Sequence, residues 1–190
     1  MIRIGIIGDI GSGKTYVANS FGYPVFNADK EVETIYKKNY QCFRKLKKKF
    51  PKFIKSFPIS KSEIANIIFF KKNNLRLVGK IVHPYVNKKL QIFLKKNNSK
   101  NVVLDIPLIL ENKIKIKKLI FIFIDSKKKD IKNVLNKRKN FNKKLYLIIK
   151  KNQLPLSFKK KKSDFIIKNE FNKIKIKKKV KFLKNKFKKL

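Results

Sequence analysis

The chain has 190 residues, of which 43% are hydrophobic, so it is long enough to bury the core of one domain. Lysine and arginine number 52 against 11 aspartate and glutamate residues, giving a formal net charge of +41. A single cysteine, Cys42, excludes an internal disulfide and a cysteine-based metal cluster. No apolar run approaches the roughly 20 residues that span a bilayer. The chain starts with a strand-like segment and not with a signal peptide, so we expect a cytoplasmic protein without a membrane partner.

The positive charge has two explanations. Charge of this size attracts the phosphate backbone of nucleic acids regardless of sequence. Alternatively, it reflects codon usage, because lysine, asparagine, isoleucine and phenylalanine are encoded by A/T-rich codons. Almost all the charge is lysine, and the arginines are Arg3, Arg44, Arg76 and Arg138. Lysines also lie on nearly every segment instead of in one patch, so we favour codon usage and expect no specific nucleic-acid partner.

The first element is a short buried strand at residues 2–7, and a helix begins at residues 16–21. Between them lies Gly8-Asp9-Ile10-Gly11-Ser12-Gly13-Lys14-Thr15, which fits the phosphate-binding loop G-x-x-x-x-G-K-[ST] in its strand–loop–helix setting. Glycines let the backbone N–H groups turn inward around an oxyanion, and the helix N-terminus adds positive charge. Lys14 would reach the outer phosphates of a nucleoside triphosphate, and the Thr15 hydroxyl would hold Mg²⁺. The alternative is a glycine-rich turn that merely joins strand to helix.

Helices dominate the next part of the chain. A second strand at residues 23–26 ends in Asn27-Ala28-Asp29. Ser60 and Glu63 have the spacing of a capping box. Apolar periodicity predicts helices at residues 30–49 and 64–70. Two further helical segments are expected to meet at His83-Pro84 and to end near residue 96, because proline suits the first turn of a helix.

The last part alternates apolar strands with helices. Asp105 lies in the first of these strands, which Pro107 stops. The expected elements are strands at residues 102–106 and 119–124, a helical region at 130–152 broken near 138–141, a loop at 153–157, a lysine run at 159–162, a strand at 165–167, and a basic amphipathic helix at 171–190. Continuous apolar strands between helices indicate an α/β fold whose parallel sheet is covered on both faces.

Together these segments resemble the dephospho-CoA kinase family over nearly the whole chain. The resemblance is carried by Gly8–Thr15, Asn27-Ala28-Asp29, His83-Pro84, the segment 105–112, Lys137-Arg138, the segment 153–156, and the segment 163–167 with Asn169. It implies a single P-loop kinase domain over residues 1–190, in which helices flank a parallel five-stranded sheet. It also implies a helical acceptor-binding insertion at about residues 57–97 and a lid at about 126–157.

The activity implied by the resemblance is transfer of the γ-phosphoryl group of ATP to the ribose 3′-hydroxyl of dephospho-CoA, with Mg²⁺ as cofactor. We expect a monomer or a weak homo-oligomer with this small-molecule substrate. The sequence departs from the family at two sites: Asp9 stands where a second glycine is common, and Asn27 where an aspartate is common. A lid more basic than usual, at residues 139–151, is a third departure.

Two carboxylates are candidates for chemistry. Asp29 follows the second strand, where it could take or orient the proton of the acceptor hydroxyl; the alternative is an N-cap of the helix before Lys30. Asp105 ends a strand expected beside the first one and could hold Mg²⁺ through water. The alternative for Asp105 is a strand-end acid satisfied by backbone N–H groups.

Further residues receive roles from the resemblance. The loop residues Gly8, Asp9, Ile10, Gly11, Ser12 and Gly13 would surround the phosphates with Lys14 and Thr15. His83, Pro107 and Leu108 would contact the acceptor, although a lone histidine is often structural. Arg138 would contact ATP from the lid, since a guanidinium matches phosphate oxygens bidentately, or else lie on the solvated surface. Asn169 would contact adenine, or else be an ordinary turn residue.

Two competing hypotheses remain at this point. One is a P-loop protein that binds nucleic acid through its lysines and uses ATP as a switch. The other is a decayed enzyme that folds but turns over slowly. Formation of ADP that depends on dephospho-CoA, and not on DNA or RNA, distinguishes the kinase from both.

Overall fold

The computed structural model describes residues 1–71, 73–112, 114, 116–139 and 141–188. The chain divides into two compact units. The first unit comprises Met1–Asn27, Asn97–Asn142 and Lys150–Leu190. The second comprises Ala28–Lys96 and Lys143–Ile149.

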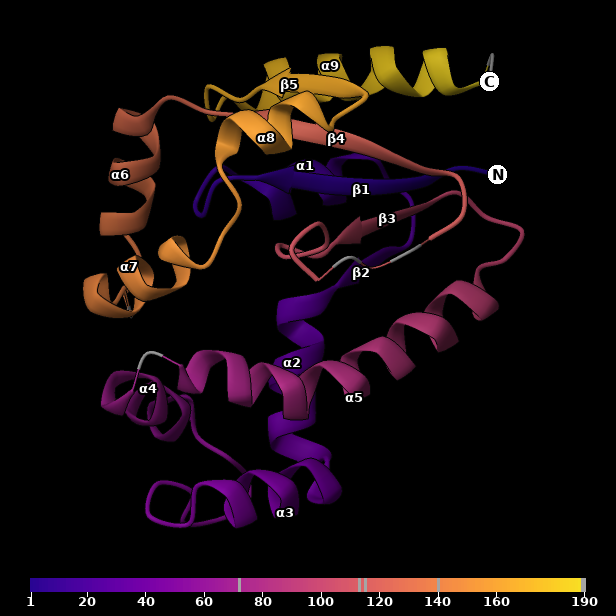
Figure 1. Ribbon diagram of the computed structural model, residues 1–190. Helices are drawn as coiled ribbons and strands as arrows, with labels where there is room; N and C mark the ends of the chain where they lie inside the picture. The colour runs from indigo at the N-terminus through magenta and orange to yellow at the C-terminus, as the bar shows by residue number, and fades with distance from the viewer. Residues whose placement is uncertain (72, 113, 115, 140, 189–190) are drawn as a thin grey trace. The chain divides into compact units, whose positions relative to one another are not determined.

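The first unit is built on a parallel sheet. Its strands are β1 (Arg3–Gly8), β2 (Val25–Asn27), β3 (Val102–Asp105), β4 (Leu119–Asp125) and β5 (Phe165–Lys168). They are arranged in the order β2-β3-β1-β4-β5, and every pair is parallel, as Figure 1 shows. The predicted α/β fold with five parallel strands is therefore confirmed for the described residues. All five carboxyl ends face one edge, where β2 and β3 bring Asn27 opposite Asp105.

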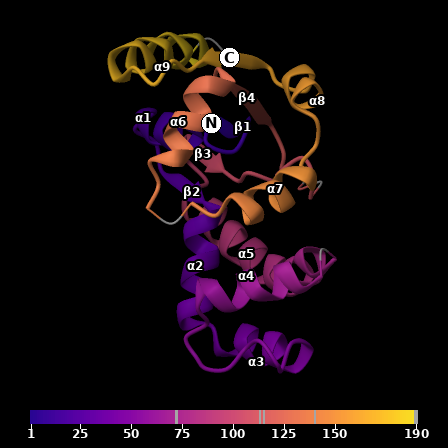
Figure 2. The ribbon, with the colours of Figure 1, turned by 90° about the vertical axis from the view of Figure 1, so that its left-hand side faces the viewer.

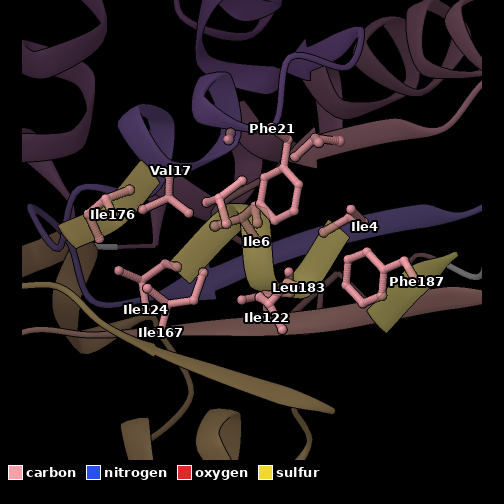
Figure 3. Close-up of a cluster of buried hydrophobic side chains, with 13 residues drawn as sticks. Ile4, Ile6, Val17, Phe21, Ile122, Ile124, Ile167, Ile176, Leu183 and Phe187 are labelled. Carbon is pink, nitrogen blue, oxygen red and sulfur yellow. The ribbon is translucent and has the colours of Figure 1, made fainter. Parts of the chain in front are cut away.

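Helices pack on both faces of this sheet. On one face, α1 (Lys14–Ser20) packs against α9 (Lys173–Phe187), and α8 (Leu156–Lys161) lies on the other (Figures 1 and 2). Isoleucines of the central strands, such as Ile4, Ile6 and Ile122, interdigitate with apolar side chains of α1 and α9 (Figure 3). The other buried residues of this core are Val17, Ala18, Phe21, Val103, Ile124, Ile167, Ile176, Val180, Leu183 and Phe187. This burial fixes the strands whose ends carry the polar residues.

The second unit is helical. It contains α2 (Ala28–Lys38), α3 (Tyr40–Lys49), α4 (Lys61–Phe70), α5 (Asn74–Lys96) and the 143–149 part of α7 (Lys143–Lys151). Its core includes Ile35, Leu46, Ile67 and the cysteine, Cys42, whose thiol pKa burial raises to about 11. Among the described residues, no helix has the length and apolarity needed to cross a membrane.

Two helix predictions in this unit are wrong. The helix expected at residues 30–49 is split, because Asn39 adopts an extended backbone and its side-chain oxygen accepts a hydrogen bond from Cys42 N at 2.8 Å. The break expected at His83-Pro84 is absent, and α5 runs through Pro84. A proline inside a helix costs about 3 kcal/mol. The buried side chains of Val78, Val82 and Leu90 on both sides of Pro84 offset that cost.

The other boundaries follow the sequence more closely. The capping box of α4 is present, with the Ser60 and Glu63 side chains each accepting the other's backbone N–H. The break predicted near 138–141 falls between α6 (Lys128–Asn136) and α7. Helix α8 occupies part of the stretch predicted as a loop and a lysine run, and Lys159 of that run is buried. Residues 189 and 190 of the predicted last helix lie outside the described residues.

Candidate active site

The phosphate-binding loop lies between β1 and α1, as predicted. Gly11 and Gly13 have φ angles of +83° and +85°, in the left-handed region that side chains disfavour. At Gly8 a Cβ would lie 2.8 Å from the carbonyl oxygen of Ile124, so a larger residue would collide with the neighbouring strand. Gly8 also has a positive φ of +150°, so the loop needs glycine for backbone conformation at all three positions and, at Gly8, for close packing as well.

Lys14 is the first residue of α1, and it is mostly buried. Its ammonium folds back over the loop, where Nζ donates hydrogen bonds to the carbonyl oxygens of Asp9 at 2.7 Å and Gly8 at 3.4 Å. These contacts keep a positive charge against the backbone of the loop. An ammonium held there is placed to neutralise phosphate oxygens on the same loop.

Three side chains converge at the carboxyl ends of β2 and β3. Asp105 is buried, and its Oδ2 accepts hydrogen bonds from Thr15 Oγ1 at 2.5 Å and from Asn27 Nδ2 at 2.8 Å. The sheet register places Asn27 directly beside Asp105, so the second contact follows from strand pairing. Thr15, which follows Lys14, is thus in direct contact with Asp105, which ends β3.

The Thr15 hydroxyl and the Asp105 carboxylate offer oxygen ligands that suit Mg²⁺. This ion prefers hard oxygen ligands and is commonly held by one or two protein groups together with phosphates and water. Among the described residues, no three His, Cys, Asp or Glu side chains gather as a metal cluster. A hydroxyl and a carboxylate beside a phosphate loop therefore fit a cation that takes its remaining ligands from a nucleotide.

Asp9, the unusual acid of the loop, is buried, and its carboxylate has two contacts among the described residues. Its Oδ1 accepts a hydrogen bond from Ile10 N at 2.8 Å, and its Oδ2 forms an ion pair with Lys150 Nζ at 3.3 Å. The carboxylate is thus held by its own loop and offset by a lysine. Sequence reasoning did not find Lys150, because nothing distinguishes it from the neighbouring lysines.

Asn169 is buried at the end of β5 and contacts the phosphate loop. Its Nδ2 donates to the Ser12 carbonyl oxygen at 2.8 Å, and Ser126 Oγ donates to the same oxygen at 3.0 Å. Ser126 was not predicted as a site residue. Its place directly after the strand that ends in Asp125 was the one available signal, since strand ends in a parallel sheet gather at the same edge.

The segment after β3 carries Pro107 and Leu108, both half-buried. It is fastened by Glu111, whose Oε1 pairs with Lys159 Nζ at 2.7 Å and accepts from Leu154 N at 3.1 Å. Lys159 is fully buried, and Glu111 Oε2 has no hydrogen-bond partner among the described residues. This buried ion pair was also missed, because a lysine run usually marks a solvated face.

Three further predicted residues lie on other elements. Arg138 is exposed in the turn after α6, in the first unit. In the second unit, Asp29 lies in the first turn of α2, which begins at Ala28, so Asp29 is not the N-cap. His83 lies in α5 with its ring against Gly79, and desolvation of the imidazole lowers the His83 pKa. Asp29 follows Asn27 by two residues along the chain.

Comparison with known proteins places this site in a family. The family model described as dephospho-CoA kinase matches residues 2–175. Dephospho-CoA kinases from Wolbachia sp. subsp. Brugia malayi and Wolbachia pipientis wMel are 34% and 32% identical, and each alignment covers 86% of this chain and 87% of the relative.

Solved structures agree with this assignment at the level of fold. TT1252 from Thermus thermophilus has a TM-score of 0.79 at 23% identity, covering 100% of this chain and 97% of its own. The dephospho-CoA kinase from Campylobacter jejuni has a TM-score of 0.67 at 23% identity, covering 98% of this chain and 97% of its own. Given the phosphate loop, the strand-end acid and a family match over nearly the whole sequence, the chain belongs to the dephospho-CoA kinase family.

Proposed function

We propose that this chain transfers the γ-phosphoryl group of ATP to the ribose 3′-hydroxyl of dephospho-CoA, forming coenzyme A and ADP. The observation that carries the proposal is the hydrogen bond from Thr15, directly after the loop residue Lys14, to Asp105 at the end of β3, together with the Lys14 ammonium that folds back over the loop backbone. Phosphoryl transfer asks a protein mainly for positioning and charge neutralisation, and these residues supply both. Membership of the family supports dephospho-CoA as the acceptor.

Thr15 and Asp105 would hold Mg²⁺. When bound, the ion would neutralise charge on the β- and γ-phosphates. The remaining work falls to side chains of the chain itself. The backbone N–H groups of the loop bind phosphate oxygens, and Lys14 adds a fixed positive charge beside them.

Asp29 takes or orients the proton of the acceptor hydroxyl. Support comes from its place along the chain: it follows β2 by two residues, and Asn27 at the end of β2 contacts Asp105. Asn27 has an amide and cannot serve as a base. Asp29 is therefore the nearest acid along the chain that can.

The remaining assignments rest on the family resemblance. Arg138 contacts the phosphates of ATP from a lid at about residues 126–157. His83, Pro107 and Leu108 contact the acceptor, with the helical part at about residues 57–97 as its binding region. The lowered pKa of His83 favours a neutral imidazole, which can donate or accept a hydrogen bond to the acceptor. None of the comparisons favours a nucleic-acid function, and we do not propose one.

The test is an ADP-formation assay with purified protein, ATP and Mg²⁺. We expect ADP only when dephospho-CoA is added, with no response to DNA or RNA and with coenzyme A as the second product. Lys14→Ala is the matched inactive variant, because it removes the ammonium beside the loop. ADP formation that ignores dephospho-CoA, or that depends on nucleic acid, would overturn the proposal.

A further inference from the structure

One carbonyl oxygen of the phosphate loop is held by two side chains from different strand ends. Ser12 O accepts hydrogen bonds from Asn169 Nδ2 at 2.8 Å and from Ser126 Oγ at 3.0 Å. Ser126 follows β4 and Asn169 follows β5. These two turns are themselves joined, because Asn169 N donates to the carbonyl oxygen of Asp125 at 2.7 Å.

The Asn169 amide has little freedom to turn. Its residue is 3% exposed, and its Oδ1 accepts a hydrogen bond from Phe171 N at 2.8 Å while Nδ2 holds Ser12. The approach to the loop is close. A Cβ placed on Gly13 would lie 2.4 Å from Asn169 Nδ2, so only glycine leaves room for this contact.

The held carbonyl determines where a neighbouring N–H points. Ser12 C=O and Gly13 N–H belong to one peptide group, which is planar and trans, so the two bonds point in opposite directions. Fixing the carbonyl against Ser126 and Asn169 therefore aims the Gly13 N–H away from those side chains. A loop binds an oxyanion more tightly when such N–H groups are held inward before the anion arrives, because no reorganisation is then needed.

We propose that Ser126 and Asn169 are positioning residues that hold the Ser12–Gly13 peptide group, so that the Gly13 N–H is presented to a phosphate of ATP. This inference rests on the proposed function. It differs from the adenine contact that the family resemblance implies for Asn169, because it ties Asn169 to the phosphates and assigns Ser126 the same task. The two roles concern opposite ends of the nucleotide.

A ligand without adenine separates them. Inorganic tripolyphosphate with Mg²⁺ is titrated against wild type, Ser126→Ala and Asn169→Ala, in competition with a fluorescent ATP analogue. We expect each variant to bind tripolyphosphate about two- to tenfold more weakly, which is the usual worth of one hydrogen bond. ATP affinity should fall by a similar factor. The double variant should lose more than the product of the single losses, because the second removal leaves Ser12 O without either donor.

A matched control comes from the same sheet. Asn101 Oδ1 accepts a hydrogen bond from Ile2 N at 2.8 Å, at the opposite edge from the loop. Asn101→Ala should lower the melting temperature and leave tripolyphosphate affinity unchanged. A merely structural role for Ser126 and Asn169 predicts this same pattern in their variants, and finding it would overturn the inference.

The remaining outcomes are also decisive. If Asn169→Ala weakens ATP but not tripolyphosphate, Asn169 contacts adenine and the inference is wrong. If Asn169→Ala does not fold, the Ser126→Ala variant tests the inference by itself, because this substitution removes only a half-buried hydroxyl. Wild-type protein that binds neither ATP nor tripolyphosphate would overturn the proposed function itself. Wild-type binding with unaffected variants would overturn only the inference.

Discussion

The Thr15 hydroxyl donates a hydrogen bond to Asp105 Oδ2 over 2.5 Å, which joins the first turn of α1 to the end of β3. Both residues lie at the carboxyl edge of the sheet, and β1 and β3 are neighbouring strands. The contact means that the two groups we assign to Mg²⁺ are brought together by the fold alone. It also makes Asp105 the first residue to test.

Asp105→Asn should raise the Mg²⁺ concentration needed for half-maximal activity by at least about tenfold, because it removes the charged ligand and keeps the side chain's size. Nucleotide binding in EDTA should not weaken. Mg²⁺ titration at saturating ATP measures the first effect. Asp125→Asn is the control, since Asp125 also ends a strand but pairs with Lys160 on the surface. An unchanged Mg²⁺ requirement would leave Asp105 as a strand-end acid held by Thr15 and Asn27.

Asp29→Asn should lower kcat by about 10²- to 10⁴-fold, the usual worth of a positioned general base. The dissociation constant of ATP should hardly change, because the loop and Lys14 are untouched. Loss of a negative charge in the first turn of α2 should cost about 0.3–1 kcal/mol of stability. Steady-state kinetics, ATP titration and thermal melting give the three values.

Glu31→Gln provides the comparison for Asp29, because Glu31 is the other acid in that first turn. It should cost similar stability and leave kcat near wild type. Near-normal turnover in Asp29→Asn would make the Asp29 carboxylate structural and move the search for the base to Asp105.

The Asp9–Lys150 ion pair predicts a rescue. Lys150→Met should weaken ATP binding by about 1 kcal/mol, roughly fivefold, because it leaves a carboxylate uncompensated in the phosphate loop. Asp9→Asn, which keeps the oxygen that accepts from Ile10 N, should bind ATP at least as tightly as wild type. The double variant should recover the affinity that Lys150→Met loses. Calorimetric ATP titration of all three is the measurement, with exposed Lys151→Met as control. A double variant as weak as Lys150→Met would refute the compensation.

The buried pair of Glu111 and Lys159 should matter for stability. The Glu111 side chain is 11% exposed and the Lys159 side chain 1%. Lys159→Met leaves the largely buried Glu111 carboxylate without its ion-pair partner, which should cost about 3–5 kcal/mol in the free energy of unfolding. Glu111→Leu combined with Lys159→Met should recover most of that loss. Urea denaturation measures both. Lys160→Met should cost less than about 1 kcal/mol, because the Lys160–Asp125 pair is on the surface. Equal losses at 159 and 160 would contradict the burial argument.

His83 predicts a pH effect on stability. Desolvation lowers its pKa in the folded state below the unfolded value, so folding favours the neutral ring. The stabilisation is present above the unfolded pKa and is lost as pH falls through the folded pKa. His83→Gln removes the chain's only histidine. When the pH is lowered from 7.5 into the acidic range, the free energy of unfolding should therefore fall less in this variant than in wild type. Urea midpoints at several pH values test this, and identical pH profiles would count against it.

Local patterns predicted where the loop and the strand end lie in the fold, because the residues of each are contiguous. The loop Gly8–Thr15 and the strand that ends in Asp105 are each set by a short run of sequence. The contacts of Ser126 and Asn169 with Ser12 could not be predicted, because they depend on which strands are neighbours in the sheet. Lys159 was missed for another reason. Where lysine is so common, its presence carries almost no information about burial.

The helix errors have a similar cause. Apolar spacing continues across Asn39, so periodicity alone joined α2 to α3, and the hydrogen bond from Cys42 N to Asn39 decides the break. Pro84 was given too much weight against the apolar residues on its two sides. In both cases one polar or cyclic residue competes with packing. Whether the helix breaks or continues there depends on side-chain contacts, which the spacing of apolar residues in the sequence does not reveal.

The convergence of Ser126 and Asn169 on Ser12 also bears on protein engineering. A designer who grafts the segment Gly8–Thr15 onto another sheet transfers its glycines, its lysine and its threonine. The graft leaves behind the two anchors that fasten the segment from outside, since they belong to turns more than 100 residues away in sequence. To transfer this motif with its geometry, a designer must therefore transfer three loops and not one.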